Sequence, residues 1–176
     1  EVLAKSKEHE VPITLRFQEL RDEQMQPAHG ELPFFLQENT VIQFLQYPYE
    51  QVVAENFVEI LEKMELINDL SCYEEIYGIL KKEALDGRKV EQQIIEVGTK
   101  RELFFGKDRL DTVLHYKDYT YMKRKWTAYL KRERKKEPDW VEVMTLLEAF
   151  FPPVWRAIIR DEIFIGDWMP ELCRFL

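Results

Sequence analysis

The segment PYEQVVAENFVEILEKMELI, residues 48–67, decides the fold class that this sequence predicts. Pro48 stands where the first turn of a helix tolerates a residue that lacks an N–H. Six apolar residues then recur at steps of three and four positions, namely Val53, Phe57, Ile60, Leu61, Met64 and Ile67. Because this spacing puts them on one face of a helix, the segment predicts an amphipathic helix that packs against a core.

Helical patterns continue toward the C-terminus. Ser71 and Glu74 have the spacing of a capping box, and the helix that they open should end at Gly87, a residue suited to a left-handed cap. The next helix should stop at Gly98, and Asp108 is placed to cap the one after it. Short connections of this kind favour antiparallel neighbours.

The last helical signals surround a pair of prolines. Asp139 and Glu142 repeat the capping geometry before an apolar face, which should end at Pro152 and Pro153 because proline crowds the preceding turn. A separate helix is expected from Val154. The sequence therefore predicts an all-α fold of about seven antiparallel helices, arranged as a bundle or as stacked helical hairpins.

The N-terminal part gives weaker signals. We expect residues 1–10 to form a flexible segment and residues 11–176 to form a single α-helical domain, since no shift in composition marks a boundary. Alternating apolar residues over 11–17 indicate extended backbone, so the start of the chain is expected to be extended. Residues 25–33 carry prolines and a glycine that predict a turn, and residues 34–45 indicate a short helix.

Composition places the chain among globular proteins. Its 176 residues are 45% apolar and 13% aromatic, which is enough to bury a core without disulfide support. The two cysteines, Cys72 and Cys173, are far apart in sequence and are expected to be reduced core thiols. No apolar run reaches the length of a membrane span, so no membrane partner is expected. The chain reads as a fragment of a larger intracellular protein.

The segment KRKWTAYLKRERKK, residues 123–136, is the strongest pointer to function. It holds eight of the 25 basic residues and one of the 33 acidic residues, in a chain whose net charge is −8. On a helical wheel Tyr119, Met122, Tyr129 and Leu130 fall on the side of Trp126 and predict a core face. The opposite face forms a cationic stripe, with one aromatic residue beside it: Arg124, Lys125, Lys131, Arg132, Arg134, Lys135 and Tyr121.

Several interpretations of the stripe stay open. The first is a solvated face that is partly paired with acids of neighbouring helices. The second is a docking surface for an acidic or amphipathic peptide segment, and the third is a nucleic-acid contact made to phosphates. Self-association, in which the stripe meets acidic helices of another copy, is a further alternative. No base-reading motif accompanies the stripe. The clusters KRK and KRERKK also resemble nuclear-localisation signals, which favours the nucleus over the cytoplasm.

An aromatic segment near the C-terminus gives a second candidate surface. Residues 163–170, IFIGDWMP, place Phe164 and Trp168 around a glycine, where one helical face cannot bury every apolar residue. They are expected either to be exposed as partner contacts or to cap the end of the bundle.

Catalytic and metal-binding patterns do not emerge from the sequence. The histidines His9, His29 and His115 have no second ligand at metal-binding spacing, and no glycine-rich phosphate loop occurs. We therefore expect no metal, no cofactor and no enzymatic activity. The function predicted is a protein–protein interaction domain of the scaffold or adaptor class, with the nucleic-acid-binding module as the alternative.

Overall fold

The computed structural model describes residues 2–6, 9–13, 28–33 and 41–176. The chain divides into two compact units, an N-terminal unit, Glu1–Tyr47, and a helical unit, Pro48–Leu176. This division differs from the boundary after residue 10 that the sequence suggests. Most of the described residues are helical, which confirms the predicted fold class.

The N-terminal unit contains two antiparallel hairpins in its described part. Strand β1, Val2–Ser6, pairs with β2, His9–Ile13, and β3, Ala28–Pro33, pairs with β4, Val41–Gln46. The extended backbone predicted over 11–17 is confirmed for 11–13, and 14–17 lie outside the described residues. Residues 2–6 form a strand within the segment that we expected to be flexible.

The short helix predicted over 34–45 is wrong wherever the structure describes it. Residues 41–46 form β4, and 34–40 lie outside the described residues. Val41 and Ile42 are β-branched and favour extended backbone, and Val41 lies opposite Pro33 of β3 in the hairpin. Likewise, residues 28–33 of the predicted turn form β3, and 25–27 lie outside the described part.

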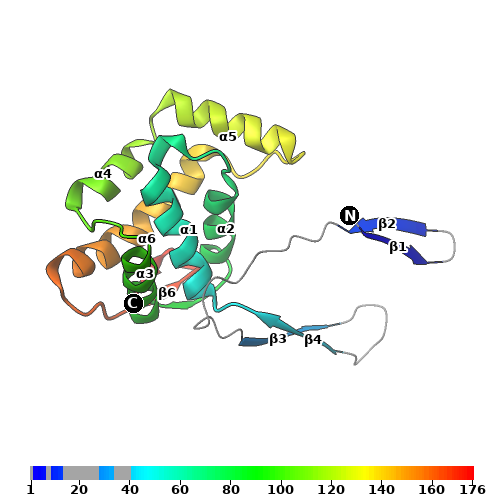
Figure 1. Ribbon diagram of the computed structural model, residues 1–176, viewed down its shortest axis with the longest axis horizontal. Coiled ribbons are helices and arrows are strands. Elements are labelled where there is room, and N and C mark those ends of the chain that lie inside the picture. The colour runs from blue at the N-terminus through cyan, green and yellow to red at the C-terminus, as the bar shows by residue number, and fades with distance from the viewer. Residues whose placement is uncertain (1, 7–8, 14–27, 34–40) are drawn as a thin grey trace. The chain divides into compact units, whose positions relative to one another are not determined.

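The helical unit is built around a central helix (Figure 1). Helix α1, Tyr49–Lys63, continues as a short 3₁₀ turn, Met64–Leu66, and packs against α2, Ser71–Leu80, and α3, Gly87–Lys100. The long helix α6, Trp140–Arg160, packs on α2, α3 and α4, Lys107–His115. Helix α5, Thr120–Arg132, lies along the edge of the unit and contacts α6.

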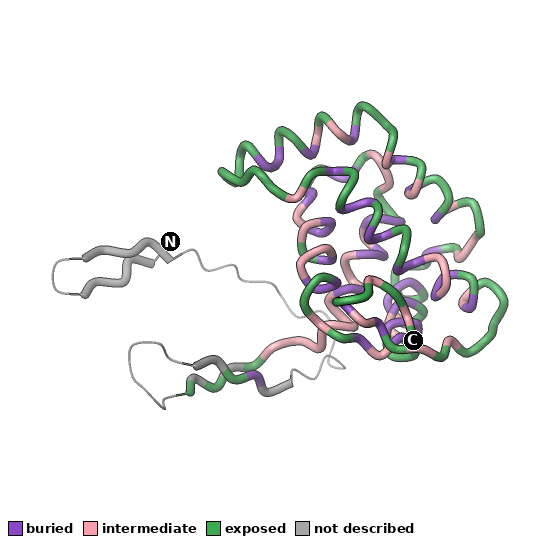
Figure 2. Tube along the Cα trace, turned by 180° about the vertical axis from the view of Figure 1, so that it is seen from behind, coloured by how far each residue is buried: buried purple, intermediate pink, exposed green. Residues whose placement is uncertain are grey.

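The core lies around α1 and includes buried residues from each of the helices α1 to α6. Val53, Phe57, Ile60 and Leu61 are buried, which confirms the predicted face of α1. The ring of Phe57 stacks on Phe151 with centroids 3.7 Å apart. In Figure 2 the buried residues recur along each helix on the side that faces its neighbours. The hydrophobic effect at this face supplies the main free energy that holds the unit together.

A small sheet closes the unit beside α3. It consists of β5, Leu85–Asp86, β6, Asp167–Met169, and β7, Arg174–Phe175, in the order β5-β6-β7. The Gly87 N–H donates to the Gly166 carbonyl at 3.0 Å, and a Cβ at Gly87 would overlap that oxygen and the Phe164 ring. Gly87 is therefore required for close backbone approach.

Three predicted helix boundaries are wrong. Helix α2 ends at Leu80, and Gly87 begins α3, whose N-cap is the Asp86 side chain. Gly98 lies inside α3, where the Phe105 ring fills the space beside it, so packing overrides the tendency of glycine to end a helix. The third boundary is the proline pair of α6.

Helix α6 continues through Pro152 and Pro153 instead of breaking there. Burial accounts for this continuity, since Phe150 and Phe151 on one side of the pair and Val154 on the other are all buried in the core. Both halves of the helix are thus fastened by tertiary contacts, which offset the two lost backbone hydrogen bonds.

The predicted caps have mixed outcomes. The Asp139 side chain accepts a hydrogen bond from the Glu142 N–H at 2.8 Å and caps α6, as predicted. By contrast, Leu70 occupies the N-cap position of α2 and Gly106 that of α4, so the side chains of Ser71 and Asp108 do not cap those helices. Asp69 supplies the acceptor at the start of α2 instead, because its carboxylate accepts a hydrogen bond from the Ser71 N–H at 3.1 Å.

Candidate binding groove beside helix α5

Helix α5 separates an apolar face from a charged one. Trp126 is 2% exposed, and Met122, Tyr129 and Leu130 are buried beside it, as the periodicity predicts. The indole N–H of Trp126 donates to the Pro138 carbonyl at 2.8 Å, and its ring lies 5.7 Å from that of Trp140. Trp126 is thus a structural anchor and cannot stack on a nucleotide base.

Two residues of the predicted helix lie outside it. Tyr119 is 47% exposed rather than part of the core face, because it is the N-cap, with extended backbone, and does not follow the helical period. At the other end α5 stops at Arg132, and Arg134 has left-handed backbone at φ 57°. The Lys135 N–H then bonds the Leu130 carbonyl at 2.8 Å, as in a Schellman motif, so the chain turns away.

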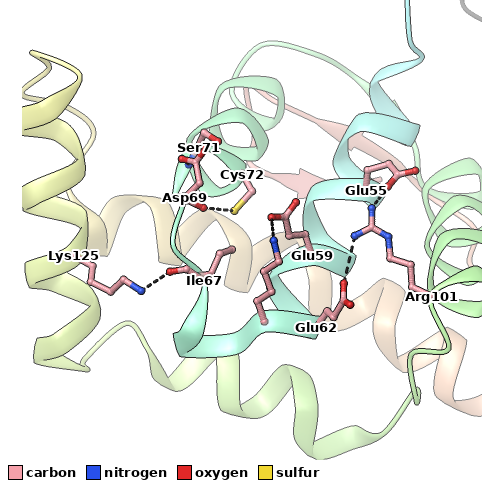
Figure 3. A network of polar contacts seen from close by, with 10 residues as sticks. Glu55, Glu59, Glu62, Ile67, Asp69, Ser71, Cys72, Arg101 and Lys125 are labelled. Atoms are coloured by element: carbon pink, nitrogen blue, oxygen red, sulfur yellow. Dashed lines mark hydrogen bonds and ion pairs between the residues drawn. The ribbon is translucent and has the colours of Figure 1, made fainter. Parts of the chain in front are cut away.

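Lys125 belongs to the scaffold rather than to a free surface. Its ammonium group reaches from α5 and donates to the carbonyls of Glu65, at 3.1 Å, and Ile67 (Figure 3). The same group lies 5.3 Å from the centre of the Tyr121 ring. These contacts satisfy carbonyl groups at the end of the 3₁₀ turn, so Lys125 fastens α5 to the rest of the helical unit.

Three more basic residues of the segment have acidic partners. Arg132 pairs with Asp69 at 3.6 Å and with Glu133 at 3.0 Å. Lys135 pairs with Glu74 of α2 at 2.5 Å, and the exposed pair of Lys123 and Asp118 has a separation of 3.7 Å. The interpretation as a face paired with neighbouring acids therefore holds for this part of the stripe.

The remaining cations have no partner among the described residues. They are exposed and make neither an ion pair nor a side-chain hydrogen bond there, and we call them the unpaired cations: Arg124, Lys131, Arg134 and Lys136. Arg124 and Lys131 lie on α5, whereas Arg134 and Lys136 lie on the connection to α6. Their charges are thus available to an anionic partner.

A groove with a volume of about 580 Å³ runs beside α5. Trp126, Leu130 and Trp140 supply large apolar side chains, and Val141, which is 44% exposed, extends the apolar surface. Four lysines and one aspartate supply the charges. We call it the α5 groove, and its lining residues are Lys123, Trp126, Thr127, Leu130, Lys131, Lys135, Lys136, Asp139, Trp140 and Val141.

The groove combines predicted residues with others that the sequence did not indicate. Lys131 and Lys135 were expected at a binding surface, whereas Asp139, Trp140 and Val141 come from the start of α6. The connection after Arg132 and the contact between the Trp126 and Trp140 rings place the start of α6 beside α5. The one available signal was Val141, an apolar residue that falls off the buried face of α6.

Lys135 of the groove belongs to a network of three side chains. The Tyr129 hydroxyl donates to Glu74 at 2.5 Å, and the other oxygen of Glu74 pairs with the Lys135 ammonium group. Burial raises the pKa of Tyr129, and the hydrogen bond to Glu74 raises that pKa further. Tyr129 is therefore protonated and acts as the donor at neutral pH.

The second predicted surface, near the C-terminus, is only partly exposed, since Ile163 and Ile165 are exposed whereas Trp168 is not. Trp168 is fully buried and donates its indole N–H to the Leu80 carbonyl at 2.8 Å. Phe164 is half-buried, and its ring lies 4.8 Å from that of Phe175. The hypothesis of an exposed contact is therefore wrong for Trp168, which caps the core, whereas Phe164 packs partly against that cap.

The described histidine and the buried cysteine were also candidates for metal binding or catalysis. Within that part of the chain, no three His, Cys, Asp or Glu side chains converge as metal ligands. His115 contacts the Asp111 carbonyl through Nδ1 at 2.6 Å, and the side chains of His9 and His29 lie outside the description. Cys72 is buried, and burial raises its pKa, which disfavours the nucleophilic thiolate (Figure 3).

No helix among residues 49–160 is long and apolar enough to cross a membrane. Comparison of the chain with protein-family models, curated protein sequences and solved structures finds no significant match. The residues of the α5 groove therefore provide the basis for a function.

Proposed function

We propose that the helical unit is a non-enzymatic protein-interaction module that binds an acidic segment of another protein in the α5 groove. One observation carries this proposal: Lys131 and Lys136, which have no acidic partner among the described residues, line a groove together with Trp126, Leu130 and Trp140. Apolar surface in a groove supplies affinity for a side chain such as Phe or Leu, and the surrounding cations select a segment rich in carboxylates.

The distribution of charge supports an acidic partner. Residues 123–136 have a net charge of +7, whereas the remainder of the chain has a net charge of −15. At physiological salt the Debye length is about 8 Å, so an approaching segment responds mainly to the charges close to the groove. The guanidinium groups of Arg124 and Arg134 can each form two parallel hydrogen bonds with a carboxylate.

Nucleic acid is the rival partner, and the unpaired cations are the observation that favours it. Arg124 and Lys131 lie about 10 Å apart along α5, a distance that spans two or three phosphates along one strand. Stacking on bases is disfavoured, however, because one aromatic candidate, Tyr121, already contacts Lys125 at 5.3 Å and Tyr119 at 5.8 Å. The geometry thus supports phosphate contact without base recognition, and we favour the acidic segment.

The same basic surface also bears on where the protein is located and on whether it self-associates. An import receptor reads basic clusters as extended peptide, and the cluster at 131–136 lies partly beyond α5 and is exposed. This favours nuclear placement of a scaffold or adaptor that contains the unit. Self-association through acidic helices of a second copy would use the same unpaired cations.

The proposal is tested by titrating the 176-residue chain against labelled probes at low and physiological salt. The first probe is a fluorescein-labelled peptide with one Phe between two runs of Glu, and its control replaces each Glu by Gln. Labelled single-stranded and duplex DNA are the rival probes. We expect anisotropy to report saturable binding of the acidic peptide, with weaker binding of the Gln peptide and of both DNAs.

Charge reversal locates the binding site. The triple variant Arg124→Glu, Lys131→Glu and Arg134→Glu should lose at least tenfold in affinity for the acidic peptide. The matched control reverses exposed residues elsewhere, with Lys82→Glu, Arg88→Glu and Arg156→Glu, and should bind as the wild type does. Equal losses in both variants, or tighter binding of DNA than of peptide, would contradict the proposal. Sedimentation at both salt concentrations reports self-association.

A further inference from the structure

One lysine of the α5 groove is already occupied by an internal carboxylate. Lys135 lines the groove, yet its ammonium group lies 2.5 Å from Glu74 of α2. The side chain of Lys135 is 48% exposed, so solvent and a ligand can still reach it. This distinguishes Lys135 from Lys131 and Lys136, which line the same groove without an acidic partner in the described part of the chain.

Glu74 is held in place by more than its ion pair. Its side chain is 22% exposed, and the Tyr129 hydroxyl donates to its second oxygen at 2.5 Å. Tyr129 is itself fixed, because its ring stacks on Trp126 with centroids 5.2 Å apart. The carboxylate is thus oriented toward Lys135 by a buried aromatic residue of the apolar face.

We propose that Glu74 is an internal competitor that lowers the affinity of the α5 groove for acidic segments. In the free protein Glu74 takes the place that a carboxylate of the partner would otherwise occupy at Lys135. The inference rests on the proposed function and adds to it a determinant of affinity. It also specifies the partner further, as a segment with a carboxylate at the Lys135 end of the groove.

The physical reason is electrostatic. An ammonium group has three donors, so a bound carboxylate can share Lys135 with Glu74, but the negative charge of Glu74 repels it at close range. Removing that charge while keeping the acceptor oxygen for Tyr129 should strengthen binding. Partly exposed ion pairs have small interaction energies, so we expect a gain in affinity of about two- to fivefold.

The test compares two neutralising substitutions on the same helix. Glu74→Gln removes the charge beside Lys135, whereas Glu75→Gln removes an equal charge from the neighbouring residue, which accepts a hydrogen bond from Asn56 at 2.8 Å. Both are titrated with the fluorescein-labelled acidic peptide in the full chain. We expect tighter binding for Glu74→Gln and unchanged binding for Glu75→Gln. Equal effects, or no gain for Glu74→Gln, would overturn the inference.

A double-mutant cycle with Lys135→Gln keeps the test decisive if one variant is less stable. In the Lys135→Gln background, Glu74→Gln should no longer raise affinity, because the ammonium group for which Glu74 and the partner's carboxylate compete is gone. A gain that persists in this background would show that Glu74 acts by another route. The two proposals fail in different measurements. The proposed function is wrong if reversing Arg124, Lys131 and Arg134 leaves peptide affinity unchanged, whereas this inference is wrong if only Glu74→Gln has no effect.

Discussion

Helices α1 and α5 are attached to the protein in different ways. Helix α1 is central, and its buried side chains meet α6 through stacked rings such as Phe57 and Phe151. Helix α5 lies at the edge, and much of its attachment is polar, through Lys125, Tyr129 and the indole of Trp126. The contrast teaches that the apolar centre holds the fold, which leaves the outer face of α5 available for recognition.

The largest expected effect is at the centre of α1. Phe57→Ala removes a fully buried ring from between Phe151 and Trp155, so the free energy of unfolding should fall by about 3–5 kcal/mol. Urea denaturation followed by circular dichroism measures this loss. Leu66→Ala, at a residue that is 77% exposed, is the control and should change stability by less than about 0.5 kcal/mol.

Two glycines test how tightly the backbone packs at the small sheet and in α2. Gly87→Ala should lower stability by about 1–3 kcal/mol, because its Cβ would overlap the Gly166 carbonyl oxygen, a backbone atom. Gly78→Ala in α2 has open space around the new methyl group and should raise stability by about 0.5–1 kcal/mol. Thermal melts of the two variants should therefore shift in opposite directions, and shifts of the same sign would contradict the packing at Gly87.

The attachment of α5 is tested at Lys125. Lys125→Met keeps the length of the side chain but leaves the carbonyls of Glu65 and Ile67 without their donor, so we expect a loss of about 1–2 kcal/mol. Lys131→Met on the same helix is the matched control and should leave the free energy of unfolding nearly unchanged. If both variants were equally stable, the hydrogen bonds of Lys125 would not contribute to holding α5 in place.

The smallest effect concerns pH. The Tyr116 hydroxyl donates to Glu65 at 2.6 Å, which lowers the pKa of Glu65 below its ordinary value of 4.5. A carboxyl group with a depressed pKa in the folded state stabilises that state above pH 4.5, and this contribution is lost as the pH falls below it. Tyr116→Phe should therefore reduce the loss of stability on acidification, as measured by urea denaturation at pH 6 and at pH 3. An unchanged pH profile would show that this bond does not control Glu65.

The predictability of the site differs between its two sides. The inward face of α5 followed from the spacing of Met122, Trp126 and Leu130, because each residue of a helix advances by a constant angle. The state of each cation did not follow from sequence. Lys125 meets carbonyls about 60 positions away, and Lys135 meets Glu74 of α2, so only the tertiary structure distinguishes these from the unpaired cations.

The C-terminal segment is a second place where sequence alone could not predict the surroundings of a side chain. The sequence left open whether Trp168 is exposed or caps the core, and the structure shows that its ring is enclosed and that its N–H donates to the Leu80 carbonyl. A backbone acceptor distant in sequence leaves no trace in local composition. The groove formed with Asp139 and Val141 could likewise not be predicted from the sequence, because it depends on how the connection through Arg134 places α6 beside α5.

Residue spacing alone predicts the helical class, the buried faces of α1 and α5 and the Asp139 cap, because these depend on residues within one or two helical turns of each other. The path of α6 through Pro152 and Pro153, the burial of Trp168 and the groove beside α5 emerge only in the folded protein. Those features arise from contacts between distant segments, whose packing free energy can exceed local preferences.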